Sequence, residues 1–473
     1  MTATALPPRP AGPTRRPPAR ARLGTEARVD AGVRAGSLAL LWLTQLWLVF
    51  LWVREGGVQD LGGASSALLS TGRLSGLVAS ALLLVQVLMM ARIPVLERAW
   101  GQDRLARLHR LVGFTSFNLM IAHIGLITWG YAAGRLTATP GTIWDLTWDY
   151  PGMLLAVAGS LCLVMVVVTS IRAARRRLRY ESWHLLHLYA YLGAGLALPH
   201  QLWTGQEFLR STASTIFWWG LWIAAVVSVL VWRVARPAWR SWRHSLRVTA
   251  VVAEDDDTFS VYLAGRALHR MPVEAGQFLT WRFPGRPGWT RANPYSLSAA
   301  PDGRQLRITV KELGDGSRSL RSLTPGTRAV VEGPYGRLTA RPRTQRKVLL
   351  IGAGVGITPL RALAEGLGYA PGEATLIYRY ADRPLFRAEL EALADHRGLR
   401  IVALPGPRRR PDSWFSAHAG VVSDRDALLG WVPDLAEHDV YVCGPQEWAD
   451  AVRRTTALAG LPADQLHLET FAW

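Results

Sequence analysis

Cysteine, lysine and charge in general are scarce in this chain of 473 residues. The two cysteines, Cys162 and Cys443, exclude a disulfide scaffold and any zinc or iron–sulfur site built from several cysteines. Charged residues make up only 19% of the chain and hydrophobic residues 49%, which excludes a disordered chain and is too apolar for an ordinary soluble enzyme. Because lysine occurs only twice, the net charge of +19 comes almost entirely from arginine. The arginines cluster beside apolar runs and form no single basic face, so the composition indicates a membrane protein and argues against nucleic-acid binding.

Six apolar runs follow a tail rich in Pro, Ala and Arg at residues 1–34, which we expect to be a disordered cytoplasmic segment. Each run has about the length that a helix needs to cross a hydrocarbon core of ~30 Å. The fifth run is the least regular, because Gly193, Gly195 and Pro199 interrupt it. The sequence therefore predicts a six-helix transmembrane domain at 35–236, with spans near 35–53, 74–91, 111–130, 152–171, 184–200 and 214–232.

The arginines also indicate the orientation of these spans. Twenty-two arginines lie in the tail and in the connections after spans two, four and six. The three opposite connections carry only Arg54, Arg73, Arg135 and Arg210. Since positive charge accumulates on the cytoplasmic side of a membrane, we expect a plasma-membrane protein with both termini in the cytoplasm.

Histidines inside the spans are candidates for function, because ligating side chains are rare at membrane depth. Span three carries His109 near its cytoplasmic end and His123 near the outer end, 14 residues apart and so on one face of a helix. Span five offers His184 and His187 at the cytoplasmic level and His200 at the outer level.

Two neutral imidazoles that face each other across a helical bundle suit axial ligation of a b-type haem. Two such levels would hold two haems, stacked across the membrane as a path for single electrons. The alternative is that these histidines only pack between helices or lie at the interface. The 13 residues from His187 to His200 place the two rings on different faces of an ideal helix, unless the glycines and proline between them kink it.

From residue 245 the pattern changes to short strands separated by Gly and Pro turns, which predicts an antiparallel β-barrel at 244–342. The buried strand 347–351 then leads into a glycine-rich turn, Gly352–Pro359, and a helix. Alternating strands and helices continue to the end, which predicts an α/β doubly wound nucleotide-binding domain at 345–473.

In combination these features resemble bacterial members of the ferric reductase and NADPH oxidase superfamily. These proteins fuse a six-helix haem-binding membrane domain to a ferredoxin–NADP reductase-like flavin and nicotinamide module. The resemblance covers about residues 36–473. It rests on the histidine spacings, Asn293-Pro294-Tyr295-Ser296, the Gly352–Pro359 turn, Cys443-Gly444-Pro445 and the ending Glu469-Thr470-Phe471-Ala472-Trp473.

For the membrane domain, the resemblance implies two b-type haems. His109 would pair with His187 at the cytoplasmic level, and His123 with His200 at the outer level. His184 is the alternative inner ligand, and His187 is preferred because its spacing to His200 resembles the family pattern.

For the flavin, the resemblance implies that Tyr295 packs on the ring of FAD and that Ser296 hydrogen-bonds near its reactive nitrogen. The family usually has His or Arg two residues before the aromatic, where this chain has Asn293. Charge pairing with the flavin phosphate is therefore expected from Arg291. The other residues expected at FAD are Pro294 and, at the pyrophosphate, Gly314 and Ser317.

For the nicotinamide nucleotide, the resemblance places Cys443 and Glu469 beside the site of hydride transfer. Trp473 would cover the flavin face and swing aside before the transfer. Arg379 and Arg383, after the strand that follows the glycine turn, favour the 2′-phosphate of NADPH, although the neighbouring Asp382 would suit NADH. The residues expected at the nucleotide pyrophosphate and beside it are Gly352, Gly354, Gly356, Thr358, Pro359, Gly444 and Pro445.

Together these observations predict a membrane enzyme that passes electrons from cytoplasmic NAD(P)H through FAD and two haems to an acceptor at the outer face. Ferric chelates are the favoured acceptor, because the outer loops carry the carboxylates Asp60, Asp145, Asp149 and Glu207, whose hard oxygens suit Fe³⁺. The alternative is an oxidase that reduces O₂ to superoxide. The alternative from another class is a membrane transporter or scaffold with a regulatory nucleotide domain. Lipid is the expected environment, and the oligomeric state does not follow from the sequence.

Overall fold

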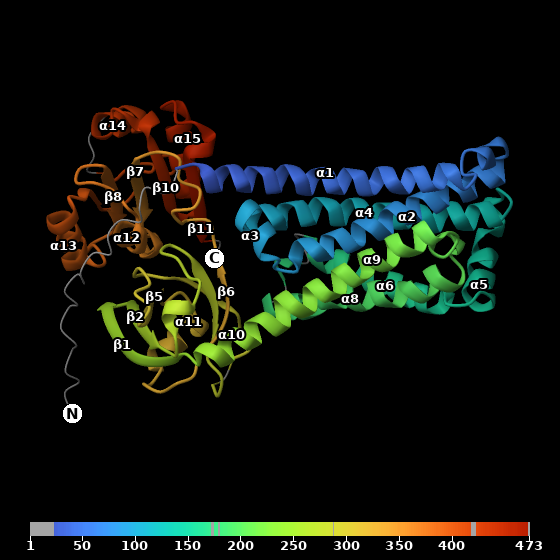
Figure 1. Cartoon of the computed structure of the whole chain (residues 1–473), viewed down its shortest axis with the longest axis horizontal. Helices are drawn as coiled ribbons and strands as arrows, with labels where there is room; N and C mark the ends of the chain where they lie inside the picture. Colours follow the sequence, from blue (N-terminus) through green and yellow to red (C-terminus); the bar gives the residue numbers. More distant parts are fainter. Residues whose placement is uncertain (1–22, 172–174, 178–179, 287, 418–421, 472–473) are drawn as a thin grey trace. The chain divides into compact units, whose positions relative to one another are not determined.

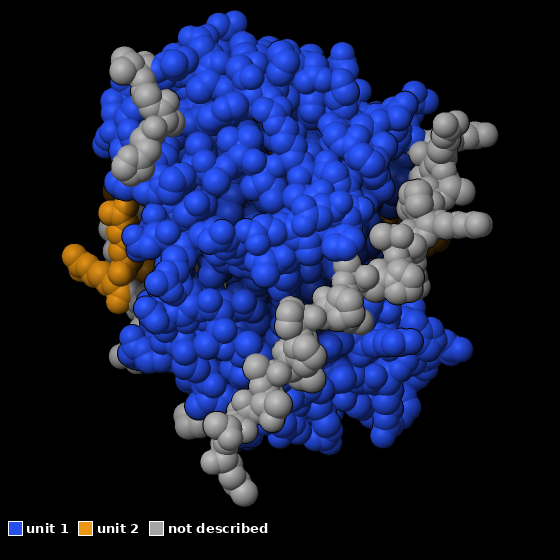
Figure 2. All heavy atoms as spheres, turned by 90° about the vertical axis from the view of Figure 1, so that its left-hand side faces the viewer, with its two compact units in different colours: residues 1–32, 97–102, 235–473 blue, residues 33–96, 103–234 orange. Residues whose placement is uncertain are grey.

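The computed structural model describes residues 23–171, 175–177, 180–286, 288–417 and 422–471 (Figure 1). The chain divides into two compact units, which Figure 2 colours separately. The first unit contains Met1–Gly32, Glu97–Gln102 and Ala235–Trp473, and the second contains Val33–Leu96 and Asp103–Val234. Helix α1 (Thr25–Arg54) runs without a break from the first unit into the second.

The second unit is built from long helices whose apolar side chains remain exposed. Leu40, Trp42 and Phe114 are each about two thirds exposed, which is unfavourable in water and favourable in lipid. Besides α1, the long helices are α2 (Ala64–Met90), α4 (Gln102–Tyr131), α6 (Met153–Ser170), α8 (Tyr180–Trp203) and α9 (Thr212–Ser228). The short helices are α3 (Pro94–Trp100) and α5 (Thr139–Asp149).

Within the described residues, five helical stretches are long and apolar enough to cross a membrane. They are α1, α2, α4, α6 and the continuous stretch Thr212–His244. This last stretch contains α9, a π-helical segment (Val229–Ala235) and α10 (Arg236–His244). Helix α8, which covers the fifth predicted span, is not among the five, so a count of six spans stays a prediction.

Helices α6 and α8 pack against each other at two glycines. A Cβ atom at Gly159 would lie 2.7 Å from the carbonyl oxygen of Gly193, and one at Gly193 would lie 2.9 Å from that of Gly159. Small residues let two membrane helices approach this closely, where van der Waals contact between backbones holds them together. This contact fixes the position of α8, which carries three of the candidate histidines.

The expectation of a disordered tail through residue 34 is wrong for its last ten residues, because α1 begins at Thr25. The start of the apolar run shows only where the helix becomes hydrophobic. It does not show where the helix begins, because the first turns are polar. Those turns are held by a hydrogen bond from the backbone N–H of Gly24 to the carbonyl of Arg343 and by the buried side chain of Asp30. The remainder of the expected tail, 1–22, lies outside the described residues.

Two three-stranded antiparallel sheets follow α10, in the orders β1-β2-β5 and β4-β3-β6. Isolated bridges join them at Leu297 and Ile308 and at Arg247 and Arg328, around a core that includes Phe259. Closure of the sheets into the expected barrel stays a prediction. The elements are β1 (Arg247–Asp255), β2 (Thr258–Ala264), β3 (Phe278–Arg282), β4 (Asn293–Ser296), β5 (Gln305–Lys311), β6 (Val330–Tyr335) and α11 (Asp315–Ser319).

The last part of the chain forms a five-stranded parallel sheet in the order β11-β10-β7-β8-β9, as predicted for a doubly wound domain. Leu360 and Leu390 belong to the core on one face of the sheet, and Leu428 and Trp448 to the core on the other. The strands are β7 (Lys347–Ala353), β8 (Ala374–Tyr380), β9 (Arg400–Pro405), β10 (His438–Pro445) and β11 (Leu466–Phe471). The helices are α12 (Ile357–Gly366), α13 (Arg387–Arg397), α14 (Asp424–Trp431) and α15 (Gln446–Leu458).

Candidate functional site

The membrane unit brings four of its five candidate histidines together as two facing pairs. The ring centres of His109 on α4 and His187 on α8 are 6.0 Å apart, with an angle of 63° between the rings. Those of His123 and His200, on the same two helices, are 6.4 Å apart at 50°. The ring that faces His109 is thus that of His187, the preferred residue of the two that the sequence left open. The mismatch expected for the 13-residue spacing does not prevent the second pair from forming; Pro199 lies inside α8, directly before His200.

These separations fit an iron ion held between two imidazoles. A metal–imidazole bond is about 2 Å long and the nitrogen lies about 1 Å from its ring centre, so two axial rings have centres about 6 Å apart. Among the described residues, no group of three or more His, Cys, Asp or Glu side chains could hold a metal ion. A porphyrin, when bound, would supply four nitrogens to an iron ion held by either pair.

Hydrogen bonds to backbone carbonyls orient the two rings on α4. Nδ1 of His123 lies 2.8 Å from the carbonyl oxygen of Gly72, and Nδ1 of His109 lies 3.3 Å from that of Gln86. A carbonyl can only accept, so each Nδ1 carries the proton and each Nε2 keeps its lone pair for a metal. Gly76 on α2 leaves room for the His123 ring, since a Cβ atom there would lie 2.5 Å from Nδ1.

Two of the four outer carboxylates expected to suit Fe³⁺ are already occupied by arginine. Arg73 on α2 forms ion pairs with both Asp60 and Glu207, the latter at 3.2 Å, and Arg210 lies 3.6 Å from Glu207. The sequence could not show these pairs, because Arg73 and Glu207 are 134 residues apart. The two other carboxylates are on α5, where both are exposed beside Trp144 and Trp148.

The residues expected at the flavin lie on β4 and on the turn before α11. Tyr295 is paired with Leu279 of β3, and its carbonyl accepts a hydrogen bond of 3.2 Å from the indole N–H of Trp281. Burial raises the pKa of the Tyr295 phenol to about 12, so it stays neutral and can donate a hydrogen bond at physiological pH. Ser296, the next residue, is buried. Asn293 donates to the backbone carbonyls of Trp281 and Arg291 and so fixes the start of the strand.

The turn expected at the flavin pyrophosphate is preorganised by Ser317. Its hydroxyl oxygen accepts from the backbone N–H groups of Leu313 and Gly314, at 2.9 and 3.1 Å. A Cβ atom at Gly316 would lie 3.5 Å from a guanidinium nitrogen of Arg291. The structure therefore brings Arg291 to this turn, as charge pairing with a bound phosphate requires.

The glycine-rich turn and the Cys443-Gly444-Pro445 segment meet at the carboxyl ends of β7 and β10. Gly354 has a positive φ of 54°, and a Cβ atom at Gly356 would lie 2.3 Å from the carbonyl oxygen of Cys443. Only glycine permits this approach, so the turn residues 352–359 and the end of β10 form one surface, where ligands bind in doubly wound sheets. Thr358 donates to the carbonyl of Val355 at 2.9 Å and closes the turn.

Cys443 and Glu469 are neighbours in the register of β10 and β11. Burial, and then the charge of Glu469, raise the pKa of the Cys443 thiol well above its usual range, so the thiol stays protonated. The Glu469 carboxylate also reaches Gly336, just after β6, where a Cβ atom would lie 3.1 Å from it. Trp473, expected over the flavin, lies outside the described residues and its role stays a prediction.

Arginines gather at the end of β8, where a ribose 2′-phosphate is expected. Arg379 donates to the carbonyl of Gly406 at 3.1 Å, and its buried Nε has no hydrogen-bond partner among the described residues. Burial, and then the charge of Arg408, lower the pKa of Arg379. Sequence reasoning missed Arg408, since it follows the next strand. Arg383 is exposed.

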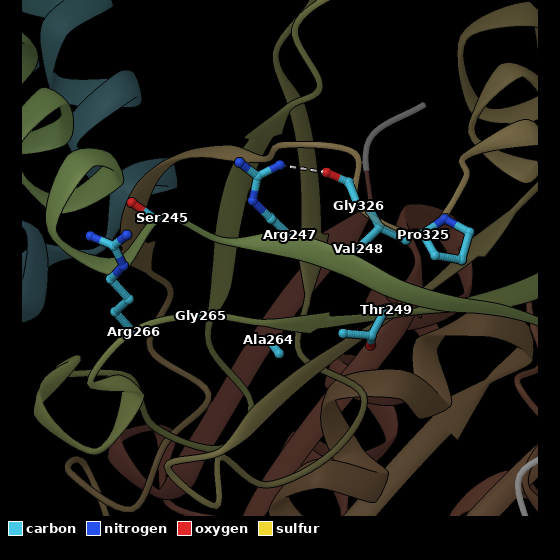
Figure 3. A pocket seen from close by; sticks show the side chains of 9 residues that line it. All are labelled: Ser245, Arg247, Val248, Thr249, Ala264, Gly265, Arg266, Pro325 and Gly326. Atoms are coloured by element: carbon cyan, nitrogen blue, oxygen red, sulfur yellow. Dashed lines mark hydrogen bonds between the residues drawn. The ribbon is translucent and has the colours of Figure 1, made fainter.

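A cavity of about 620 Å³ lies away from these residues, between β1, the end of β2 and the loop before β6 (Figure 3). Arg247 and Arg266 line it, and Arg247 donates to the carbonyl of Gly326 at 2.8 Å. None of the expected site residues lines this cavity. It therefore adds nothing to the haem, flavin or nucleotide sites.

A membrane unit with paired histidines and a following module with flavin- and nucleotide-type turns define a class, the membrane-bound reductase-type proteins. Comparisons with known proteins agree. Residues 75–198 match the family "ferric reductase like transmembrane component", and residues 350–454 match the "oxidoreductase NAD-binding domain". The chain belongs to the superfamily in which a ferric reductase-like transmembrane domain is fused to a ferredoxin reductase-type FAD/NAD module. The resemblance inferred from the sequence is confirmed.

Individual relatives match the second half of the chain. The ferredoxin–NAD(+) reductase component of the alkene monooxygenase system of Xanthobacter autotrophicus is 32% identical over 244 residues, which are 48% of this chain and 70% of that protein. A flavohemoprotein of Xylella fastidiosa is 31% identical over 211 residues, 42% of this chain. The chain spans about half (51%) of that flavohemoprotein. A solved ferredoxin reductase of carbazole 1,9a-dioxygenase aligns with a TM-score of 0.39 at 25% identity, over 48% of this chain and 69% of that chain.

Proposed function

We propose that this protein is a transmembrane flavocytochrome b that takes electrons from cytoplasmic NAD(P)H and delivers them to an acceptor at the outer face. The observation that carries the proposal is the pair of facing histidine couples, with ring centres 6.0 and 6.4 Å apart, in a chain that also has a reductase module. The 14 residues between His109 and His123 separate the two levels by about 21 Å along α4. Two haems at these levels would divide one membrane crossing into short steps.

FAD, when bound, links the two-electron chemistry of nicotinamide to the one-electron chemistry of haem. The chain's own residues position and protect the transfer. Gly354 and Gly356 let the nucleotide turn approach the end of β10. Cys443, fully buried and protonated, brings no charge of its own to the transfer site. Tyr295 keeps its phenolic proton and can donate it in a hydrogen bond to a bound ligand.

We further propose six spans with both termini in the cytoplasm, and NADPH as the preferred donor. The support for six spans is the match of residues 75–198, which includes most of α8, to the transmembrane family. The support for NADPH is the position of Arg379 at the end of β8, where its buried Nε has no hydrogen-bond partner among the described residues. Arg379→Ala should raise KM for NADPH at least about tenfold and KM for NADH much less. Equal effects on the two nucleotides would refute this preference.

For the acceptor we propose a ferric chelate. The exposed α5 supports this, with Asp145 and Asp149 alternating with the indoles of Trp144 and Trp148, whose ring centres are 5.6 Å apart. Under anaerobic conditions, the purified protein should consume NADPH when a ferric chelate is added. If consumption requires oxygen and superoxide accounts for the electrons, the oxidase alternative replaces the ferric reductase.

An absorbance spectrum tests the class itself. The purified protein should show flavin and b-type haem bands. His109→Leu or His187→Leu should remove one haem and His123→Leu or His200→Leu the other, while His184→Leu, the control, should keep both. A wild-type protein without haem bands would support the transporter or scaffold alternative, and loss of a haem in the control would correct the inner ligand.

A further inference from the structure

The polar start of helix α1 is docked on the reductase module. Asp30 is only 2% exposed, and both of its carboxylate oxygens accept from one guanidinium. Arg341 donates through Nε to Oδ1 and Oδ2, at 3.2 and 3.1 Å, and through Nη2 to Oδ1 at 2.8 Å. Six residues earlier, the N–H of Gly24 donates to the carbonyl of Arg343 at 3.1 Å. The pair of Asp30 and Arg341 joins residues that are 311 positions apart in the sequence.

The arginine belongs to the segment 336–346, which connects the antiparallel sheets to the parallel sheet. This linker is itself rigidly held. The Tyr441 hydroxyl donates to the carbonyl of Thr339 at 3.0 Å, and the buried carboxylate of Asp439 accepts from the backbone N–H of Thr344 at 2.7 Å. Asp30 therefore contacts a fixed point between the flavin-type and nucleotide-type halves of the module.

The geometry of the pair is that of a specific, charge-assisted contact. A bidentate guanidinium–carboxylate pair restricts orientation as well as distance. The hydrogen bond to Asp30 raises the pKa of Arg341, in keeping with a stabilised charge. Neutralising Arg341 would leave the buried Asp30 carboxylate without its ion pair, and neutralising Asp30 would leave Arg341 only the exposed Glu26, so the contact should open in either case.

The docked turns belong to the same helix as the first membrane span. Helix α1 is continuous over 30 residues, and its apolar part begins only at about residue 35. The covalent connection between membrane unit and module runs elsewhere, through α10. The start of α1 and residues 97–102 both group with the module in one compact unit, so Asp30 provides a contact in addition to the covalent connection at α10.

We propose that Asp30 and Arg341 are positioning residues: their pair latches the start of α1 to the linker of the reductase module, and electron transfer from a bound flavin to the haems depends on this latch. This inference rests on the proposed flavocytochrome function. Without the pair the start of α1 could leave the linker, and electron transfer out of the flavin would then be limited by the fraction of molecules in which the contact is formed. Hydride transfer into the flavin, within the module, would not depend on the latch.

The test compares Asp30→Asn and Arg341→Gln with Glu26→Gln in the full-length protein. Glu26 is the matched control, because it lies 3.5 Å from Arg341 but is well exposed. In stopped-flow experiments, NADPH-driven haem reduction should slow at least about tenfold in the first two variants and stay unchanged in the control. NADPH-driven reduction of ferricyanide, which takes electrons directly from the flavin, should remain at the wild-type rate in all three. The double exchange Asp30→Arg with Arg341→Asp should restore part of the haem reduction rate.

Two results of the rate measurements would overturn the latch. One is haem reduction at the wild-type rate in Asp30→Asn; the other is an equal loss of ferricyanide and haem reduction, which would mean that the pair only supports folding of the linker. Amide hydrogen exchange gives a measurement that needs no haem. Exchange of residues 25–34 should rise in Asp30→Asn and not in Glu26→Gln, and no rise would refute the contact. Wild-type protein without haem bands would refute the proposed function, while the exchange data would still decide whether the latch exists.

Discussion

The two halves of the reductase module should separate more easily when Glu389 loses its charge. This carboxylate, on α13, accepts from Arg307 of β5 through two nitrogens, at 2.7 and 3.0 Å. It also pairs with Arg361 of α12 at 2.6 Å. The side chain of Arg307 is only 6% exposed and stacks over the Phe386 ring. Glu389 is thus the anion paired with Arg307 and, together with Glu365, with Arg361.

The magnitude follows from what would remain after Glu389→Gln. Removal of one partner from a buried ion pair costs about 3–5 kcal/mol, because an unpaired charge stays buried. Arg307 retains hydrogen bonds to the carbonyl and hydroxyl oxygens of Ser298, so the lower end, about 3 kcal/mol, is expected. For a domain of this size, each kcal/mol changes Tm by about 2–4 °C, which gives a decrease of about 6–12 °C.

The same contacts predict a dependence on pH. Burial alone would raise the pKa of Glu389, but the hydrogen bond from Arg307 and the charges of Arg361 and Arg307 outweigh it and lower the pKa. Because the folded pKa lies below the unfolded value of about 4.3, this stabilisation is complete above that pH. It is lost as the pH falls through the folded pKa. The difference in Tm between wild type and Glu389→Gln should therefore be constant from pH 6 to 8 and shrink as acid is added below about pH 4.

The assay is thermal unfolding of the full chain in detergent, followed by the rise in flavin fluorescence. Glu391→Gln is the matched control, two residues along the same helix, where the pair with Arg387 at 2.8 Å is exposed. Exposed pairs contribute about 0–1 kcal/mol, so the control should stay within about 2 °C of wild type. The reasoning fails if Glu389→Gln and Glu391→Gln unfold at the same temperature.

Three further predictions follow from close contacts and burial. Gly193→Ala should force α6 and α8 apart and diminish both haem bands, because its Cβ would lie 2.9 Å from the carbonyl oxygen of Gly159. The control Gly195→Ala, which has open space around it, should leave the spectrum unchanged. Gly356→Ala should raise the Kd of NADPH at least about tenfold in a titration, since the turn must move away from β10; Gly430→Ala on α14, also in open space, should not. Cys443, whose pKa is raised by burial, should resist iodoacetamide at pH 8 and react only after unfolding; rapid labelling of the native protein would contradict its burial.

The depth of the histidine pairs could be predicted from the sequence, and their facing geometry only in part. Fourteen residues between His109 and His123 is close to four helical turns, so one face followed from the spacing alone. The 13-residue spacing from His187 to His200 gave the opposite expectation for an ideal helix. The actual placement depends on Pro199, a local effect, and on the approach of α8 to α6 at Gly193, a tertiary effect. The regular repeat of an α-helix describes neither of them.

Local motifs in the module could be predicted because their residues are neighbours in the sequence. Contacts between residues that are distant in the sequence could not. The glycine turn before α12 occupies neighbouring positions, so its strand–turn–helix context could be predicted and was found. The pairing of Asp30 with Arg341, by contrast, depends on how separate segments fold together. Asp30 also lies in a stretch whose composition resembles a disordered tail. A short polar segment gains its order from the surface on which it docks, which its own composition does not reveal.

The outer carboxylates show how such long-range pairing changes a chemical inference. Counted in the sequence, Asp60 and Glu207 were candidate oxygen ligands for Fe³⁺. In the structure both are paired with Arg73, so their charge is largely neutralised and binding of a cation there would require breaking ion pairs. The unneutralised acidic surface is that of α5, where Asp145 and Asp149 have no salt bridge among the described residues and both side chains are exposed. If ferric chelates are recognised by charge, Asp145→Asn with Asp149→Asn should raise KM for a cationic ferric chelate, whereas Asp60→Asn should not. An unchanged KM in the double variant would mean that the charge of α5 does not recognise the chelate. The acceptor would then be selected by its shape or by the edge of a haem alone.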